Sequence, residues 1–183
     1  MSDEQPSLPP RISPPSAYDA TQLAELAKAP HRPDGEPLNA FATLAHRPEL
    51  MRRVNALGGY FPRSSELPVR TREIAILRVA GTLACAYELH HHGALAIPAG
   101  LTPAEVRAAA DATSAHPWAA SDRQILEMTD ALIEHAPVDD VTWAALDGVL
   151  DDGQRLELMI LVGFYAMLAG VFNTVGVELD PLS

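Results

Sequence analysis

From residue 38 onward, apolar side chains recur every three or four positions, and no segment alternates apolar and polar residues as a half-buried strand does. No Asn-Gly or Asp-Gly pair stands between alternating segments, so hairpins are not indicated. The pattern predicts an all-α fold, a helical bundle. Two of the predicted helices begin with the residue spacing of a capping box, Thr102 with Glu105 and Ser121 with Gln124. Helices are expected at residues 38–45, 48–58, 68–83, 86–97, 103–112, 122–135, 140–150 and 154–173.

The first 37 residues differ from the rest because they hold eight of the 16 prolines. Proline interrupts regular elements, so this stretch is expected to be an extended arm with one short helix near residues 21–29, capped by Asp19 or Thr21. Such an arm is either disordered or wraps a neighbouring subunit, and the sequence leaves both open. The predicted organisation is a Pro-rich arm at 1–37 and a single helical domain at 38–183.

The segment 158–177 contains no charged residue and is as long as a membrane span requires. Gly163, Gly170 and Asn173 lie within it, acidic residues follow it, and no basic cluster anchors either end. A helix that is apolar all round also suits the centre of a bundle or a subunit interface. We therefore expect a buried helix and an oligomer, with no membrane insertion.

Composition narrows the function classes. A chain of 183 residues with 48% hydrophobic residues fits one globular domain. Its net charge of -11 argues against binding to nucleic acid or to an anionic membrane surface. The single cysteine excludes a disulfide framework, and the N-terminal residues show no basic and apolar leader pattern, so a cytoplasmic location is expected. Twelve arginines against one lysine suggest a bacterial, GC-rich source.

Four ionisable residues fall on apolar helix faces between residues 67 and 102. Glu73 lies within the apolar stripe of the first of two helices, which are joined by a tight turn at residues 81–84. Cys85, Glu88 and His92 are spaced i, i+3, i+7 and therefore share one face of the second helix. Carboxyl, thiol and imidazole groups are thus expected along the buried side of these two helices.

Two interpretations of this face are open. Burial shifts the pKa of a carboxyl upward and that of an imidazole downward, so Glu88 and His92 are a candidate acid/base pair for proton transfer. Cys85 at a helix N-terminus is expected to have a stabilised thiolate, which suits nucleophilic or peroxide-reducing chemistry. Alternatively, Glu88 and His92 form a structural ion pair and Cys85 is a small core residue.

The run of three histidines at residues 90–92 raises the question of a metal site. Glu88 and His91 have the spacing found in di-iron bundles, but that fold needs two such motifs and two further Glu. A zinc site needs three or four ligands, and Glu88 with His92 supplies two. Phosphate loops, nucleophile elbows and dinucleotide fingerprints are also missing from the sequence. Neither a metal nor another cofactor is therefore predicted.

The spacing Glu73-x11-Cys85-x2-Glu88-x3-His92, with Ala-x-x-x-Gly-Leu-Thr-x-x-Glu at residues 96–105, resembles the carboxymuconolactone decarboxylase and alkylhydroperoxidase D superfamily. In the alkylhydroperoxidase D branch a second cysteine stands at the position of Glu88, and a Glu and a His relay protons for the cysteine pair. The resemblance extends over about residues 39–177. It implies a helical fold and an oligomer, commonly a trimer or hexamer. The Cys-Ala-Tyr-Glu run resembles a decarboxylase-like subgroup in which that position is acidic.

The resemblance implies catalytic roles for Glu73, Cys85, Glu88 and His92. The expected activity is that of a lyase: cofactor-free acid/base decarboxylation or isomerisation of a small unsaturated carboxylic acid or lactone. A thiol-dependent, peroxiredoxin-like activity through Cys85 is the first alternative, and a non-enzymatic protein that binds a small ligand is the second. Residues expected to contact the substrate are His46, Arg72, Tyr87 and Asn173.

Overall fold

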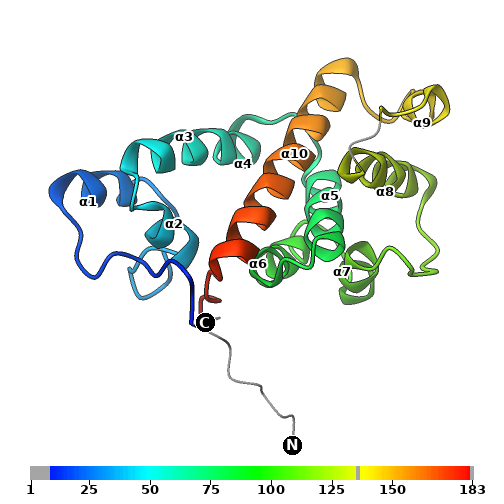
Figure 1. The fold of residues 1–183 in the computed structure, drawn as a ribbon. Coiled ribbons are helices and arrows are strands. Elements are labelled where there is room, and N and C mark those ends of the chain that lie inside the picture. Colours follow the sequence, from blue (N-terminus) through cyan, green and yellow to red (C-terminus); the bar gives the residue numbers. More distant parts are fainter. Residues whose placement is uncertain (1–8, 135–136, 182–183) are drawn as a thin grey trace, which may run out of the picture. The chain divides into compact units, whose positions relative to one another are not determined.

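The computed structural model describes residues 9–134 and 137–181. In these residues the regular elements are all α-helices, apart from one isolated bridge between His31 and Pro37 (Figure 1). The all-α prediction is confirmed. The helices are α1 Ala20–Leu26, α2 Asn39–Leu44, α3 Pro48–Gly58, α4 Tyr60–Ser64, α5 Val69–Thr82, α6 Ala86–Ala96, α7 Pro103–Ala110, α8 Ala120–Ile133, α9 Asp140–Ala145 and α10 Asp152–Val175.

The chain forms two compact units. The terminal unit comprises Met1–Asn55 and Phe172–Ser183, and the central unit comprises Ala56–Val171. Each unit is described separately. The predicted division into an arm at 1–37 and a domain at 38–183 stays a prediction, and the first eight residues of that arm lie outside the described residues.

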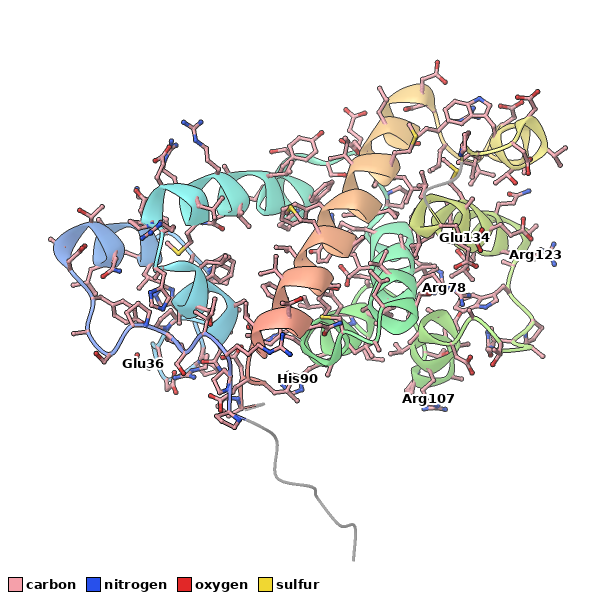
Figure 2. The ribbon with its side chains drawn as sticks, in the orientation of Figure 1. Glu36, Arg78, His90, Arg107, Arg123 and Glu134 are labelled. Carbon is pink, nitrogen blue, oxygen red and sulfur yellow. The ribbon has the colours of Figure 1, made fainter. Side chains whose placement is uncertain are left out.

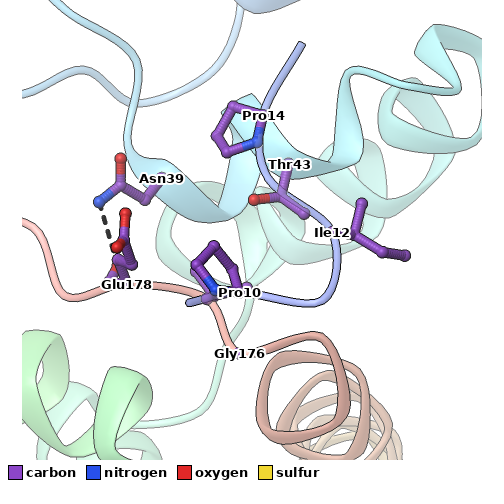
Figure 3. A pocket seen from close by; sticks show the side chains of 8 residues that line it. Pro10, Ile12, Pro14, Asn39, Thr43, Gly176 and Glu178 are labelled. Carbon is purple, nitrogen blue, oxygen red and sulfur yellow. Dashed lines mark hydrogen bonds between the residues drawn. The ribbon is translucent and has the colours of Figure 1, made fainter. Parts of the chain in front are cut away.

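In the terminal unit, segments from both ends of the chain lie together. The short helix expected near residues 21–29 is α1, and Asp19 caps it through a capping box with Gln22. The N-terminus of α2 has no cap from its own first residues, but its Asn39 amide donates to the buried Asp180 carboxylate over 3.0 Å. A shallow pocket beside this contact is lined by Pro10, Ile12, Pro14, Asn39, Thr43, Gly176, Val177 and Glu178 (Figure 3).

The central unit is built around α5, which packs against α6, α7 and α8. Its residues from Glu73 to Ala80 are all buried, because neighbours cover the helix on several sides. Gly81 allows the closest approach, since a Cβ there would lie 1.9 Å from the carbonyl oxygen of Ala110 at the end of α7. On the side facing α8, the buried Arg78 places Nε 3.5 Å from Asp130 (Figure 2).

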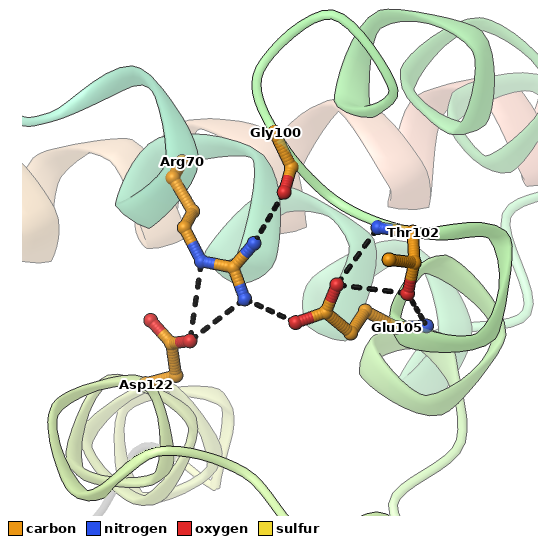
Figure 4. Close-up of polar contacts among 5 residues, drawn as sticks. All are labelled: Arg70, Gly100, Thr102, Glu105 and Asp122. Carbon is orange, nitrogen blue, oxygen red and sulfur yellow. Dashed lines mark hydrogen bonds and ion pairs between the residues drawn. The ribbon is translucent and has the colours of Figure 1, made fainter.

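Arg70 joins three elements of the central unit (Figure 4). From the first turn of α5, its guanidinium donates to Asp122 of α8 over 2.8 Å, to the Gly100 carbonyl over 2.7 Å and to Glu105 of α7. Glu105 also completes the predicted capping box with Thr102. One arginine therefore fixes the starts of three helices relative to one another.

A second polar cluster fixes the loop before α5. The Glu157 carboxylate on α10 accepts hydrogen bonds from the Ser65 hydroxyl over 2.8 Å and from the Leu67 amide over 3.0 Å, as well as from the Tyr60 hydroxyl. These contacts hold the segment between α4 and α5, and with it the first turn of α5.

Most predicted helices are present, with several corrections. The capping box of Ser121 with Gln124 is wrong, because α8 begins earlier with Ala119 as an N-cap that makes no side-chain bond. The predicted end of that helix at residue 135 lies outside the described residues. The helix expected at 140–150 ends at Ala145, and α4, which contains Pro62, was not predicted.

The last helix, α10, is long and apolar enough to cross a membrane by length and composition alone, and 33% of its most apolar window is buried. The sequence suggested that this helix is buried. Within this chain α10 is therefore only partly buried. Leu158, Leu161 and Ala169 are buried, whereas Ile160 and Met167 are 55% and 50% exposed.

Candidate active site

The turn between α5 and α6 places Cys85. Ala84 adopts a left-handed conformation with φ of 51°. Its amide donates to the Gly81 carbonyl over 3.1 Å, and the Cys85 amide donates to the Ala80 carbonyl over 2.8 Å. This is a Schellman motif, in which glycine is usual at the left-handed position. The motif makes Cys85 the N-cap residue of α6.

Glu73 and His92 form the central contact of the site. Glu73 lies on α5 and His92 on α6, and His92 Nδ1 lies 2.8 Å from Glu73 Oε2. The Glu73 side chain is 6% exposed and that of His92 is 14% exposed. An ionised carboxylate only accepts hydrogen bonds, so Nδ1 carries the proton and Nε2 is the ring nitrogen left for a substrate.

Arg72 brings positive charge to the edge of this pair. Its Nη1 donates to the Phe61 carbonyl over 2.6 Å, and its Nε lies 3.7 Å from Glu73 Oε1. The Arg72 side chain is 11% exposed. The guanidinium is therefore fixed in place beside the Glu73 carboxyl by a largely buried side chain.

Glu88 is buried on α6 without a hydrogen-bond partner. It is 3% exposed, and neither carboxyl oxygen has a partner in the described part of the chain. Burial raises the pKa of Glu88 to about 8, and the neighbouring Cys85 thiol only partly opposes this shift. The group is therefore mostly a neutral carboxylic acid near pH 7.

The expectation of a stabilised Cys85 thiolate is corrected. Burial, aided by the Glu88 carboxyl, raises the pKa of the Cys85 thiol to about 11. Backbone amides of Glu88 and Tyr87 at the start of α6 act in the opposite direction but do not compensate. The position at a helix N-terminus is as predicted, but a fully buried thiol lacks the solvation that its anion needs.

Tyr165 belongs to this cluster and was not predicted from sequence. It extends from α10, and its ring meets the His92 ring edge-on, with centroids 5.0 Å apart and planes at 89°. Burial raises the pKa of the phenol, and the Glu73 and Glu88 carboxylates raise it further. One signal was available: Tyr165 follows the buried Leu158 and Leu161 at helical spacing, so it shares their inward face.

The residues expected to contact a substrate are distributed over both units. Arg72 lies in the cluster, and Tyr87 is buried on α6 with its ring 4.6 Å from that of His91. His46 belongs to the terminal unit, where its Nε2 lies 2.8 Å from the Ser13 carbonyl. Asn173 is exposed near the end of α10 in the same unit.

The described ranges 9–134 and 137–181 contain no group of three or more His, Cys, Asp or Glu side chains arranged to hold a metal ion. His90 and His91 instead meet edge to face, with ring centroids 5.2 Å apart. The chemistry that the cluster does offer is proton transfer, since it combines a neutral acid, an imidazole held by a carboxylate, and a phenol.

Comparison with protein families gives a match over residues 48–131 to the Carboxymuconolactone decarboxylase family. The matched segment includes Glu73, Cys85, Glu88 and His92, and it ends before Tyr165. No curated protein matches the sequence.

Several solved structures share the fold. An alkylhydroperoxidase AhpD core protein from Ralstonia eutropha, described as peroxidase-related, has a TM-score of 0.71 at 21% identity and covers 80% of this chain and 78% of its own. A peroxidase-related protein from Silicibacter sp. has a TM-score of 0.72 at 18% identity, covering 90% and 95%. The debrominase Bmp8, as a cysteine-to-alanine variant in complex with 2,3,4-tribromopyrrole, has a TM-score of 0.74 at 15% identity, covering 95% and 94%.

These comparisons agree with the helical architecture and with the segment that carries the cluster. The solved structures are 15–21% identical to this chain and show its fold alone. Residues 48–131 thus match the Carboxymuconolactone decarboxylase family model, and the fold of the chain is that of alkylhydroperoxidase D-like structures.

Proposed function

We propose that this chain is an enzyme that decarboxylates or isomerises a small unsaturated carboxylic acid or lactone by acid/base chemistry, without a cofactor. The observation that carries the proposal is the state of Glu88, which is buried, lacks a hydrogen-bond partner and has a pKa of about 8. A carboxyl held neutral near pH 7 is a general acid. The alternative of a structural Glu88–His92 ion pair is disfavoured, because His92 is bonded to Glu73.

Decarboxylation at this site has two proton steps. The bond to the leaving carboxylate breaks, its electron pair enters the conjugated system, and CO2 departs. Glu88 then gives its proton to the carbanionic carbon and becomes a carboxylate. Solvent returns a proton to Glu88 through His92, whose Nδ1 is held by Glu73. In an isomerisation, His92 Nε2 first removes a substrate proton, and Glu88 supplies one at another carbon.

The proposed substrate class follows from the charge beside the cluster. We propose that Arg72 binds the substrate carboxylate, because its guanidinium is held by the Phe61 carbonyl next to Glu73 and its side chain is 11% exposed. Tyr87 is retained as a candidate for substrate contact, and His46 and Asn173 stay predictions, since they belong to the terminal unit. The tribromopyrrole bound by the debrominase makes flat unsaturated rings a further class to screen.

A direct test is a mass-spectrometric screen of unsaturated carboxylic acids, lactones and halogenated pyrroles with the full-length protein. For any acid consumed in heavy water, we expect one deuterium in the product at the carbon that lost CO2. Glu88→Gln and His92→Ala are then expected to reduce turnover by about 100-fold or more, as loss of a general acid or base does.

The matched control is Glu127→Gln, because Glu127 is an exposed carboxylate on α8. This variant should keep wild-type turnover. Full turnover in both Glu88→Gln and His92→Ala would contradict the acid/base mechanism, whatever the substrate.

The first alternative is a thiol-dependent peroxidase that uses Cys85. The names of the neighbours from Ralstonia eutropha and Silicibacter favour it. The raised pKa of Cys85 and its complete burial disfavour it, since peroxide reacts with an accessible thiolate. Intact-mass analysis after exposure to hydrogen peroxide separates the two: a rapid gain of one oxygen on Cys85 would favour the peroxidase.

The second alternative is a binding protein that holds a small ligand at the cluster without turnover, which the same screen detects as retention without consumption. We further propose that the protein is a cytoplasmic homo-oligomer, a trimer or hexamer. The exposed apolar residues of α10, including Ile160 and Met167, support the assembly.

A further inference from the structure

Tyr165 contacts the proposed base from a third helix. Its ring lies edge-on to the His92 imidazole at 5.0 Å and 89°. On its other side it meets Phe164 at 5.5 Å and 89°, and Phe164 in turn lies 6.0 Å from Phe61. This row of rings fixes Tyr165, so the edge that it presents to His92 is not free to move away.

The Glu73 bond alone does not orient the imidazole. With one hydrogen bond at Nδ1, rotation of the ring about the Cβ–Cγ bond of His92 is opposed by a single polar contact. A perpendicular aromatic contact restricts that motion because the ring plane is then set by packing. His92 is thus restrained by α5 through Glu73 and by α10 through Tyr165.

The charges around Tyr165 favour the same arrangement. Carboxyl groups face it from α5 as Glu73 and from α6 as Glu88, and Arg72 is the cation on its side of α5. Burial and the two carboxyl groups raise the pKa of the phenol, and Arg72 lowers it by less, so the ring remains neutral beside His92. A neutral ring does not compete with the Glu73 carboxyl for Nδ1 of His92.

We propose that Tyr165 is a positioning residue, whose ring holds the His92 imidazole against Glu73 so that Nδ1 stays bonded to the Glu73 carboxyl and Nε2 keeps one orientation. Its consequence for catalysis rests on the proposed acid/base function, but the orientation of His92 does not. The aromatic ring restrains His92 and the hydroxyl does not. Phenylalanine at position 165 should therefore preserve the orientation of His92, whereas an aliphatic side chain should not.

The test is long-range 1H–15N correlation of the imidazoles in the full-length, 15N-labelled protein without substrate. A His92→Gln spectrum assigns the His92 signals among the seven histidines. Wild type and Tyr165→Phe should show the Nδ1–H tautomer of His92, and Tyr165→Met should lose it in favour of a tautomer mixture. Ile160→Met is the matched control, because it places the same side chain at a position of α10 that is 55% exposed, and it should keep the tautomer.

Two results would overturn the proposal: a retained Nδ1–H tautomer in folded Tyr165→Met, or its loss in Tyr165→Phe. If Tyr165→Met does not fold, the proposal is tested in the wild-type protein. Nuclear Overhauser contacts between the Tyr165 and His92 rings must be present at a centroid distance of 5.0 Å, and their absence would overturn it. On a substrate found in the screen, Tyr165→Met should lower kcat by about 100-fold with little change in KM. Failure to find a substrate leaves the spectroscopic result intact.

Discussion

His92 Nδ1 lies 2.8 Å from Glu73 Oε2, and this contact decides the state of a third residue, Glu88. Glu88 stands one helical turn before His92 on α6 and would be its natural ion-pair partner. Because the imidazole is already bonded to Glu73, Glu88 has no partner of opposite charge and burial keeps it protonated. The two carboxyls of the cluster are thereby separated into a charged orienting group and a neutral acid.

The first prediction concerns stability and the charge of Glu88. Its pKa is about 8 in the folded chain and near 4.5 when unfolded, so the folded form retains a proton that the unfolded form loses between these values. The stability contributed by that proton is complete below about pH 4.5 and is lost as pH rises through about 8. Glu88→Gln should therefore raise the free energy of unfolding at pH 8 by on the order of 4 kcal/mol.

Urea denaturation from pH 4 to pH 8.5 measures this effect. The two proteins should differ least at the acidic end, and only the wild type should weaken toward the alkaline end. Glu127→Gln on the exposed side of α8 should follow the wild-type curve. If wild type and Glu88→Gln run parallel across the range, Glu88 is ionised in the folded protein.

The second prediction concerns Cys85. With a pKa of about 11 against an ordinary 9.0, its thiolate fraction at pH 7.5 should be about a hundredfold lower than for a free cysteine. Iodoacetamide should therefore label the native protein slowly, with burial lowering the rate further, and should label it rapidly in denaturant. Mass spectrometry over time gives both rates, and native labelling as fast as free cysteine would favour the thiol-based alternative.

Sequence spacing was sufficient for part of the site. Helical periodicity placed Glu73, Cys85 and Glu88 on apolar faces, and all three are buried. Turn position also made Cys85 a helix N-cap. These are local properties, because a helix of known register fixes which residues share a face.

The features of the site that residue spacing did not predict depend on contacts between helices. Tyr165 joins the cluster because α10 meets α6, and its spacing within α10 indicates its face but not the helix that this face meets. The Cys85 pKa reversed the expectation because burial depends on all surrounding elements. Ser121 failed as a cap because α8 begins before it, at a position where no side chain bonds the first turn.

The third prediction concerns the left-handed residue before Cys85. Ala84 has φ of 51°, which places its Cβ close to the backbone, and its side chain is exposed. Ala84→Gly should therefore stabilise the protein by about 0.5–1 kcal/mol, since relief of strain exceeds the added backbone entropy. Thermal denaturation measures the change. Ala94→Gly, at an exposed position inside α6, should instead destabilise by about 1 kcal/mol, and equal effects in both variants would contradict this account.

The fourth prediction concerns the junction at Arg70. Its guanidinium holds the pKa of Glu105 down to about 2, with the Thr102 amide contributing. A lowered pKa contributes stability that is present above about 4.5 and is lost as pH falls toward 2. Glu105→Gln keeps the capping box but removes the charge, so it should cost about 1 kcal/mol at pH 7. The stability deficit of Glu105→Gln should shrink as pH falls toward 2. A deficit that does not change with pH would mean that it comes from a weakened capping box and not from the lost charge.

The fifth prediction concerns the uncovered face of α10. Ile160 and Met167 are seven residues apart, so they lie on one side of the helix, and both are half exposed. If this side is a subunit interface, Ile160→Glu and Met167→Glu will bury a charge on assembly and dissociate the oligomer. Light scattering after size-exclusion chromatography should then show a smaller mass than wild type, while circular dichroism stays helical. Val141→Glu, at an 81% exposed position on α9, should assemble as wild type does. A wild-type monomer at micromolar concentration, or unchanged assembly in both α10 variants, would mean that this face is not the interface.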